Sequence, residues 1–266
     1  MLKTRILTAC ALAAVLLLLI FFLPDRGWGL VVALVVWFAT GEWARLIGAS
    51  KVGRHVFGLL AIVPVVAWAF TKSDPIVLGA AYVAALALWV FSVPVFLRFN
   101  LRLEGPYARF GYGLLIFISA ALALIELRRG SPLLLLVCLL PIWIADIAAF
   151  FVGRKWGRTK LAPTISPGKS REGVAGAVVA VALYAVVLYL CVPGIASRVG
   201  LPMLLGLSLV FTCLSVCGDL FESLLKRHAG VKDSGDLLPG HGGILDRVDS
   251  LLATLPLAGL LWLIYQ

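Results

Sequence analysis

The sequence predicts an all-α polytopic integral membrane protein, a helical bundle of about nine transmembrane helices. The chain of 266 residues is 62% hydrophobic and only 14% charged, which leaves too little polar surface to cover a soluble core of this length. Its apolar residues form continuous runs of about 20 residues, the length that a helix needs to cross a bilayer. The runs lack period-two alternation, and lipid leaves the backbone no hydrogen-bond partner outside its own helix.

Nine apolar runs are separated by more polar segments. They cover residues 5–23, 28–47, 55–71, 76–97, 110–127, 132–153, 173–192, 202–225 and 244–265. Four prolines lie inside runs, where packed membrane helices tolerate the distortion that we expect from them. These are Pro64, Pro94, Pro141 and Pro256.

The first run has some features of a signal peptide. Lys3 and Arg5 precede it, and residues 7–10, Leu-Thr-Ala-Cys, are similar to a lipoprotein cleavage site. In a signal peptide the apolar region comes before the cleavage site. Here most of that region, residues 11–23, follows Cys10, so we expect an uncleaved first helix.

Basic residues are distributed unevenly between the two sides of the predicted bundle. Because cytoplasmic loops carry an excess of Lys and Arg, the richer side is predicted to be cytoplasmic. That side holds Lys3, Arg5, Lys51, Arg54, Arg98, Arg102, Arg109, Arg154, Lys155, Arg158, Lys160, Lys169, Arg171, Lys226, Arg227 and Lys232. The other holds Arg26, Lys72, Arg128, Arg129 and Arg198. We therefore expect the N-terminus to be cytoplasmic and the C-terminus outside.

This orientation places two long polar loops, 154–172 and 226–243, in the cytoplasm. The formal net charge of +10 is explained in part by attraction to anionic lipid headgroups, which accounts for scattered residues such as Arg98 and Arg102. No nucleic-acid partner is expected. Headgroup attraction does not explain why charge is concentrated in these two loops, which indicates a site that binds a cytosolic ligand.

Six carboxylates lie at membrane depth, where a charge near the bilayer centre costs about 2.5–3.5 kcal/mol on insertion scales. They are Glu42, Asp146, Asp219, Glu222, Asp246 and Asp249. Asp219 and Glu222 end one predicted helix, and Asp246 and Asp249 begin the next. Spacing of i, i+3 puts each pair on one helical face, so we expect the two faces to converge.

Convergent carboxylates favour a hard cation. Without Cys or His at ligand spacing, the chemistry indicates Mg²⁺, which commonly binds one or two carboxylates together with substrate phosphates. Asp219, Asp246 and Asp249 are the predicted ligands. The alternative is that Lys226, Arg227 and Arg247 simply neutralise the acids, and this interpretation is favoured for Glu222 and Asp236.

Glycines near the last predicted helix could bring backbone N–H groups close to an anion. The segment 238–243, Leu-Pro-Gly-His-Gly-Gly, leads directly into that helix, and a helix N-terminus favours negative charge. Taken alone, the segment would be an ordinary Pro-Gly turn. The neighbouring acids and cations favour a phosphate contact instead.

The loop 154–172 is also basic and rich in glycine. It lacks the P-loop pattern, so a nucleotide triphosphate would be held in another way. Hydroxyls of Ser166 and Ser170 together with Lys169 could bind phosphates. For Ser166 an equal alternative is that a Ser-Pro turn caps the following helix.

Two motifs resemble those of the phosphatidate cytidylyltransferases, also called CDP-diglyceride synthetases. The first is S-x-x-K-R, then K-D, then H-G-G-x-x-D-R-x-D. Its positions are Ser223, Lys226, Arg227, Lys232, Asp233, His241, Gly242, Gly243, Asp246, Arg247 and Asp249. The second lies upstream and matches the family at Asp146, Ala149, Gly153, Ser166, Pro167, Lys169, Glu172 and Gly173. The chain departs from that pattern at Ile147, Phe150 and Gly168, and Ser170 replaces a threonine.

The resemblance covers about residues 140–250. It implies the reaction of CTP with phosphatidate to give CDP-diacylglycerol and pyrophosphate, with Mg²⁺ as cofactor, in a homodimer embedded in the lipid bilayer. It also suggests a division of the chain. Residues 1–130 would form membrane helices that contact lipid tails and the dimer partner, and residues 131–266 would form the catalytic site.

Roles for individual residues follow from the resemblance. Asp219, Asp246 and Asp249 would hold Mg²⁺, and Asp233 would be a metal residue or a helix cap. The negative charge of phosphatidate or of the leaving pyrophosphate would be neutralised by Lys226, Arg227, Lys232 and Arg247. Arg247 could equally orient the two acids that flank it. His241, Gly242 and Gly243 would contact phosphate oxygens. The nucleotide would be bound with the help of Asp146, Lys169, Ser170 and Glu172.

Two alternatives stay open. A related CTP-dependent enzyme could act on an isoprenoid lipid, because the motif defines the nucleotide chemistry better than the lipid tail. Buried carboxylates in a polytopic protein also occur in ion and proton transporters. A transporter should show inverted repeats and acids near the bilayer midplane, and only Glu42 stands apart from the loop-flanking acids.

Overall fold

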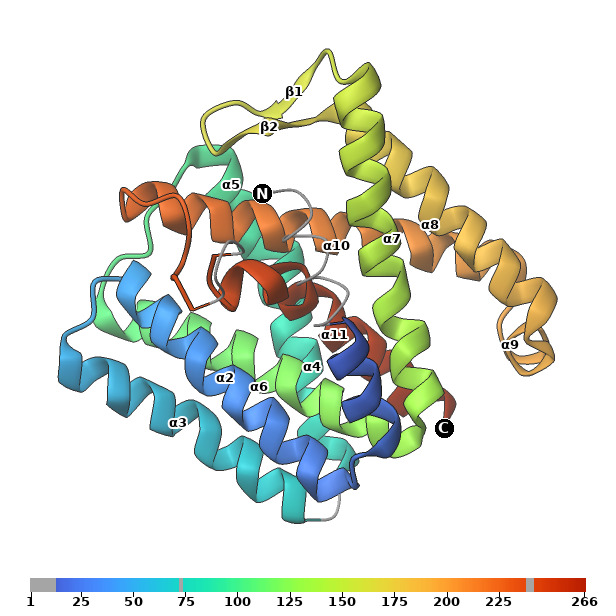
Figure 1. Cartoon of the computed structure of the whole chain (residues 1–266), viewed down its shortest axis with the longest axis horizontal. Coiled ribbons are helices and arrows are strands. Elements are labelled where there is room, and N and C mark those ends of the chain that lie inside the picture. Colours follow the sequence, from blue (N-terminus) through green and yellow to red (C-terminus); the bar gives the residue numbers. More distant parts are fainter. Residues whose placement is uncertain (1–12, 72–73, 238–241) are drawn as a thin grey trace.

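The computed structural model describes residues 13–71, 74–237 and 242–266, which form a helical bundle with one short hairpin (Figure 1). The elements are α2 Asp25–Leu46, α3 Lys51–Phe70, α4 Pro75–Ala87, η1 Leu88–Ser92, α5 Val93–Phe99, α6 Pro106–Gly130, α7 Pro132–Trp156, β1 Lys160–Ala162, β2 Ser166–Ser170, α8 Arg171–Cys191, α9 Pro193–Arg198, α10 Leu201–His228 and α11 Leu245–Tyr265. Within the described residues, eight helical spans are long and apolar enough to cross a membrane, Pro75–Phe99 counting as one.

The predicted all-α membrane fold is confirmed. Each of the last eight apolar runs corresponds to one of these spans. Of the first predicted run, only the short helix Ala13–Phe22 lies within the described residues. The N-terminal part of that run lies outside them.

The distortion expected at Pro94 takes the form of a π-helical turn. The segment η1 separates α4 from α5 and ends just before Pro94. Proline has no N–H to donate, and its ring clashes with the carbonyl of the preceding turn. A wider turn at that point accommodates the ring while the span continues to Phe99.

Helix α11 lies at the centre of the bundle and contacts α10, α6 and α4. On α10, Phe221 packs against three aromatic rings from other helices, those of Trp43, Trp89 and Phe96, at centroid distances of 6.2, 5.8 and 6.2 Å. Phe221 is 1% exposed. This aromatic core fixes the part of α10 that also carries Asp219 and Glu222.

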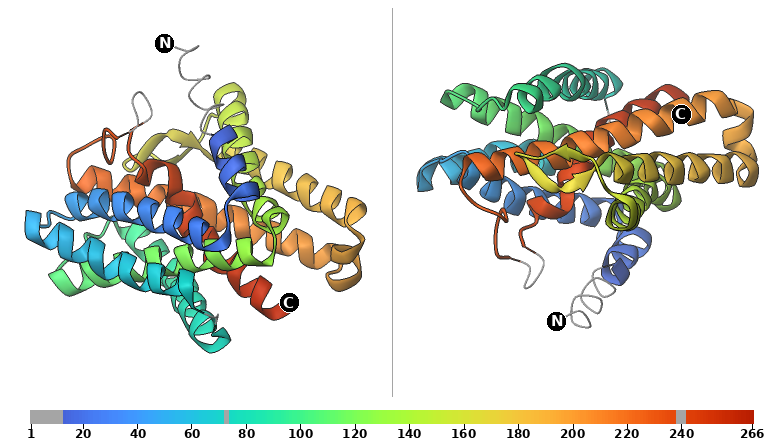
Figure 2. Two further views of the ribbon diagram at one scale, coloured as in Figure 1. Left: turned by 60° about the horizontal axis from the view of Figure 1, so that its bottom comes forward. Right: turned by 90° about the horizontal axis from the view of Figure 1, so that it is seen from above.

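A two-stranded antiparallel hairpin, β1 and β2, connects α7 to α8. Both Figure 1 and Figure 2 show it at one end of these two helices, and β2 also contacts α10. The sequence analysis expected only a polar loop here. The strands have three and five residues, too few for a recognisable period-two pattern.

At the opposite end of the bundle, a partly buried ion pair connects α6 to the end of α3. Arg129 Nη1 lies 2.7 Å from Glu126 Oε1, and Arg129 Nη2 donates to the carbonyl of Trp68 at 2.8 Å. Trp68 Nε1 in turn donates to Glu126 Oε1 at 2.8 Å. Arg129 therefore satisfies both a carboxylate and the C-terminal carbonyls of α3.

We expect Arg129→Ala to lower the free energy of unfolding by about 3 kcal/mol, because it removes a cation that lies 2.7 Å from a largely buried carboxylate. Detergent-solubilised protein titrated with SDS and followed by circular dichroism would measure this change. Arg26→Ala is the control, because Arg26 is exposed and only lies over the ring of Phe70, at 5.7 Å. Equal stability of the two variants would contradict the role assigned to Arg129.

Candidate active site

Three carboxylates meet where α10 and α11 pack together. Asp219 and Glu222 on α10 and Asp249 on α11 each offer an oxygen within 4.8 Å of the others. Glu222 is only 4% exposed. We call this group the acidic cluster. The predicted convergence of the two acidic faces is confirmed for these three residues.

Gly218 allows the two helices to approach closely enough for this cluster to form. A Cβ atom at position 218 would lie 2.5 Å from the Asp249 carbonyl oxygen and 3.1 Å from Ala253 Cβ. The first distance is too short for a carbon atom beside backbone. A side chain at 218 would therefore push α10 away from α11 and separate Asp219 from Asp249.

We expect Gly218→Ala to destabilise the protein by about 1–3 kcal/mol, the usual cost of overpacking. Gly206→Ala on the same helix is the matched control, because nothing lies within 4 Å of an added Cβ there. Alanine favours a helix over glycine by about 1 kcal/mol, so the control should be at least as stable as the natural protein. SDS titration of both variants measures the difference, and a change of the same sign in both would contradict close packing at Gly218.

Two lysines neutralise the acids. Lys169 on β2 forms an ion pair with Asp219. Lys226 on α10 lies 2.5 Å from Glu222 Oε2 and 2.6 Å from Asp246 Oδ1. The pairing interpretation for Glu222 is therefore confirmed, although Glu222 also belongs to the acidic cluster.

Asp246 lies beside this cluster rather than among its three members. Besides Lys226, it accepts hydrogen bonds from the backbone N–H of Ser234 at 3.0 Å and from the N–H of Gly243 at 2.8 Å, and Ser234 Oγ lies 3.0 Å from the same carboxylate oxygen. These contacts anchor the segment 231–237 to the start of α11. The metal role of Asp246 stays a prediction.

Glu42 fixes the same segment from the other half of the chain. Its carboxylate, on α2, accepts hydrogen bonds from Ile244 N at 3.0 Å, Leu245 N at 2.8 Å and Ser234 Oγ at 2.7 Å. Glu42 is 4% exposed. The sequence analysis noted this acid at membrane depth but assigned it no partner. The only feature of the sequence that could have indicated this contact is general: the first N–H groups of any helix, here α11, need acceptors from outside the helix.

The glycine segment before α11 is only partly described. Gly242 has φ +80, a conformation suited to glycine, and an added Cβ would lie 2.7 Å from Asp246 Oδ2. The N–H of Gly243 is already donated to Asp246, so carboxylates satisfy this helix N-terminus. Phosphate contacts by Gly242 and Gly243 stay predictions, and His241 lies outside the described residues.

Two predicted nucleotide residues hold the start of α8. Ser170 Oγ accepts from Gly173 N at 3.1 Å and is the N-cap, so the alternative that Ser166 caps this helix is wrong. Glu172 accepts hydrogen bonds from the N–H groups of Arg158 and Thr159, at 3.2 and 3.1 Å. Ser170 and Glu172 thus shape the turn that follows α7, and their contact with nucleotide stays a prediction.

Asp146 on α7 belongs to the same electrostatic environment. It interacts with the charges of Asp219, Lys169 and Arg247. The neighbouring Ile147, where the related family has threonine, is 59% exposed. Asp146 thus lies close enough to the acidic cluster to interact with Asp219, and its contact with the nucleotide stays a prediction.

The remaining predicted residues lie on the periphery. Arg227 is exposed, and its Nε donates to the carbonyl of Ile165 at 3.1 Å, which attaches α10 to the hairpin. Lys232 and Asp233 are exposed in the segment after α10. The structure does not bring these three side chains into the acidic cluster.

The acidic cluster fits a divalent cation. Its ligand atoms are all carboxylate oxygens, the type that Mg²⁺ prefers. Glu222 Oε1 is buried and accepts no hydrogen bond from any residue that the structure describes. Such a buried, unsatisfied anionic oxygen is costly unless a cation or proton compensates it.

Comparison with known proteins agrees with the resemblance seen in the sequence. The profile of the cytidylyltransferase family matches residues 3–265. A phosphatidate cytidylyltransferase of Pseudomonas aeruginosa is 40% identical over 270 residues, covering 98% of this chain and 97% of that protein. One of Haemophilus influenzae is 32% identical over 278 residues, 96% of each chain. A third, of Bacillus subtilis, is 43% identical over 138 residues, 50% of this chain and 49% of that protein. This chain belongs to the cytidylyltransferase family.

Proposed function

We propose that this protein is a membrane-embedded nucleotidyltransferase that converts CTP and phosphatidate to CDP-diacylglycerol and pyrophosphate. The observation that carries the proposal is the acidic cluster flanked by Lys169 and Lys226, in a chain of this family. The geometry supports a site for a metal-bound polyphosphate at the ends of membrane helices. A lipid phosphate and a soluble nucleotide could meet there.

The chemistry needs electrostatic help more than a base. The nucleophile is a phosphate monoester whose second pKa is about 6, so it is already ionised at neutral pH. One of its oxygens attacks the α-phosphorus of CTP and forms an O–P bond. The bond from that phosphorus to the oxygen bridging to the β-phosphate breaks, and pyrophosphate leaves with the electron pair. The obstacle is repulsion between two anions.

Residues of this chain address that repulsion. Asp219, Glu222 and Asp249 would hold Mg²⁺, which when bound screens phosphate charge and aligns the attacking and leaving oxygens. Asp246 remains a candidate ligand and anchors the neighbouring segment. Lys169 and Lys226 keep fixed positive charge beside the cluster. Arg247, whose charge interacts with that of Asp146, would help to neutralise the phosphates.

We further propose the setting of this reaction. The protein would lie in the bacterial inner membrane with the hairpin and the segment 231–237 cytoplasmic, which is supported by the excess of basic residues on that side. It would act as a homodimer, as the resemblance implies. The helices of residues 1–130 would contact lipid tails, although Glu42 also connects them to residues 131–266.

Label transfer tests the function. Purified protein should transfer label from α-³²P-CTP into phosphatidate but not from γ-³²P-CTP, which separates cytidylyl transfer from a kinase reaction. No lipid label from the α-phosphate would defeat the proposal. Faster labelling of an isoprenoid lipid phosphate would favour the related enzyme, and solute flux in liposomes without CTP would favour a transporter.

A further inference from the structure

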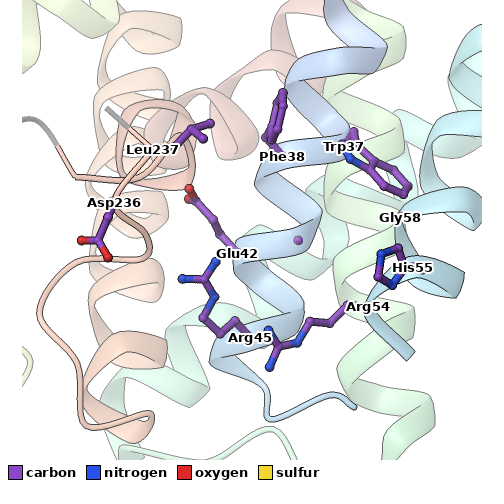
Figure 3. Close-up of a pocket in the computed structure, with 10 residues that line it drawn as sticks. Trp37, Phe38, Glu42, Arg45, Arg54, His55, Gly58, Asp236 and Leu237 are labelled. Atoms are coloured by element: carbon purple, nitrogen blue, oxygen red, sulfur yellow. The ribbon is translucent and has the colours of Figure 1, made fainter. Parts of the chain in front are cut away.

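A cavity of about 490 Å³ lies between the ends of α2 and α3 and the segment 231–237, outside the acidic cluster. Figure 3 shows its walls, formed by Trp37 and Phe38 of α2, His55 of α3 and Leu237 of the segment. We call it the α2/α3 pocket. Its walls combine aromatic rings with charged groups, as expected for a site that takes a ligand with both apolar and ionic parts.

Two guanidinium groups lie on the same side of this pocket in Figure 3, those of Arg45 and Arg54. Arg45 is exposed and pairs with no residue that the structure describes. Arg54 Nε donates to the carbonyl of Ala49 at 3.1 Å, and its Nη groups have no partner in the described part of the chain. Guanidinium forks of this kind bind phosphate oxygens in a bidentate manner.

The two acids that line the pocket do not neutralise these arginines. Glu42 directs its oxygens to Ser234 and to the N–H groups of Ile244 and Leu245. Asp236 is exposed and forms no ion pair within the described residues. Among the residues that the structure describes, no carboxylate therefore pairs with the two guanidinium groups that line the pocket.

The pocket shares a wall with the acidic site. Glu42 lines the pocket and accepts from Ser234 Oγ, and Ser234 also donates to Asp246. Asp246 and Glu222 in turn share Lys226. A phosphate bound by Arg45 and Arg54 would thus be separated from the acidic cluster by this short series of side chains.

The pocket also lies next to the lipid-facing side of the bundle. Val52, Val56 and Leu59 of α3 are 73%, 49% and 50% exposed, as expected of side chains that contact lipid. Arg45 and Arg54 lie at the ends of α2 and α3, where charged groups reach the headgroup layer. A lipid could place its phosphate in the pocket while its tails stay in the bilayer.

We propose that the α2/α3 pocket binds the phosphomonoester headgroup of phosphatidate before the lipid reaches the acidic cluster. This inference rests on the proposed function. A monoester carries up to two negative charges and three terminal oxygens, which suits two guanidinium groups better than a phosphodiester headgroup does. Leu237 and Phe38 would cover the glycerol part, since both line the pocket.

The test compares Arg45→Gln/Arg54→Gln with Lys51→Gln, whose exposed cation lies in the same turn region but does not line the pocket. Binding of phosphatidate to the full-length protein in phosphatidylcholine nanodiscs would be measured by native mass spectrometry. We expect at least about tenfold weaker binding in the double variant, since two charge-assisted contacts are lost. Phosphatidate binding by the control Lys51→Gln should differ from that of the natural protein by less than about twofold.

A kinetic comparison tests the same role in turnover. In mixed micelles, the KM for phosphatidate should rise at least about tenfold in the double variant, and the KM for CTP should not. If the double variant does not fold, Arg45→Gln alone provides the comparison, because the Arg45 side chain forms no hydrogen bond or ion pair within the described residues.

Other outcomes would overturn the proposal. Unchanged phosphatidate binding in the double variant would show that the α2/α3 pocket does not bind this lipid. An equal loss of phosphatidylglycerol binding in that variant would show general attraction to anionic headgroups. Competition by glycerol 3-phosphate at equal concentration would show a site for soluble phosphate monoesters instead of the lipid. If the natural protein transfers no label from CTP, the proposed function fails, while the nanodisc measurement still decides whether the pocket binds phosphatidate.

Discussion

Asp249→Asn is expected to reduce cytidylyl transfer by about 1000-fold. The substitution keeps the shape of the side chain but removes a charge from the acidic cluster, in which each ligand oxygen lies within 4.8 Å of the others. Loss of metal-based charge stabilisation of about 4 kcal/mol corresponds to that factor. The variant should also need at least about tenfold more Mg²⁺ for half-maximal activity, which a purely structural role would not produce.

Glu104→Gln is the matched control, because Glu104 is an exposed carboxylate in the segment between α5 and α6. It should keep natural activity and natural Mg²⁺ dependence. An unchanged Mg²⁺ requirement in Asp249→Asn would show that Asp249 is not a metal ligand, whatever the activity of the variant.

The same measurement decides the role of Asp246. If Asp246 is a metal ligand, Asp246→Asn should raise the Mg²⁺ requirement as Asp249→Asn does. If Asp246 only anchors Ser234 and Gly243, the variant should lose activity without a change in the Mg²⁺ requirement. Normal Mg²⁺-dependent turnover in purified Asp246→Asn would exclude both roles.

The largest effect on stability is expected for Glu42→Ala. The change leaves the N–H groups of Ile244 and Leu245 without their acceptor, whereas Ser234 Oγ can still donate to Asp246. Each unsatisfied group costs about 1–3 kcal/mol, so we expect the free energy of unfolding to fall by about 2–6 kcal/mol. Glu42→Gln keeps one acceptor oxygen and should lose less.

Hydrogen exchange gives this prediction a local readout. The amides of Ile244 and Leu245 should be protected in the natural protein and exchange faster in Glu42→Ala, whereas amides in the middle of α7 should change little. Glu104→Gln again serves as the control. Retained protection at residues 244 and 245 would contradict the capping role of Glu42.

The membrane fold and the central part of the site could be predicted from local patterns. Runs of apolar residues define helices by length alone, and i, i+3 spacing pairs Asp219 with Glu222 on one helix and Asp246 with Asp249 on the next. The loop between α10 and α11 is long enough to be folded yet short enough to keep the two helices adjacent, so their convergence could be predicted. The contribution of Glu222 was underestimated, because pairing with Lys226 and membership of the cluster were treated as alternatives.

The remaining features depend on contacts between residues that lie far apart in the sequence, which local residue spacing does not encode. Glu42 and Leu245 are 203 residues apart, and no local pattern connects them. Asp246 was grouped with Asp249 by helical spacing, yet backbone donors of Ser234 and Gly243 occupy one of its oxygens. Ser170 rather than Ser166 caps α8, because the hairpin strand β2 continues to Ser170.

The contact between Glu42 and α11 also constrains how the protein is made. A ribosome delivers α2 to the membrane early, whereas the N–H groups that satisfy its carboxylate arrive with the last helix of the chain. Until then the nascent protein carries an unsatisfied acid at membrane depth, where burying a charge is costly. The segment around Asp246 therefore acquires its final shape only at the end of synthesis, so truncated chains that lack α11 should be substrates for membrane quality control rather than partly active enzymes.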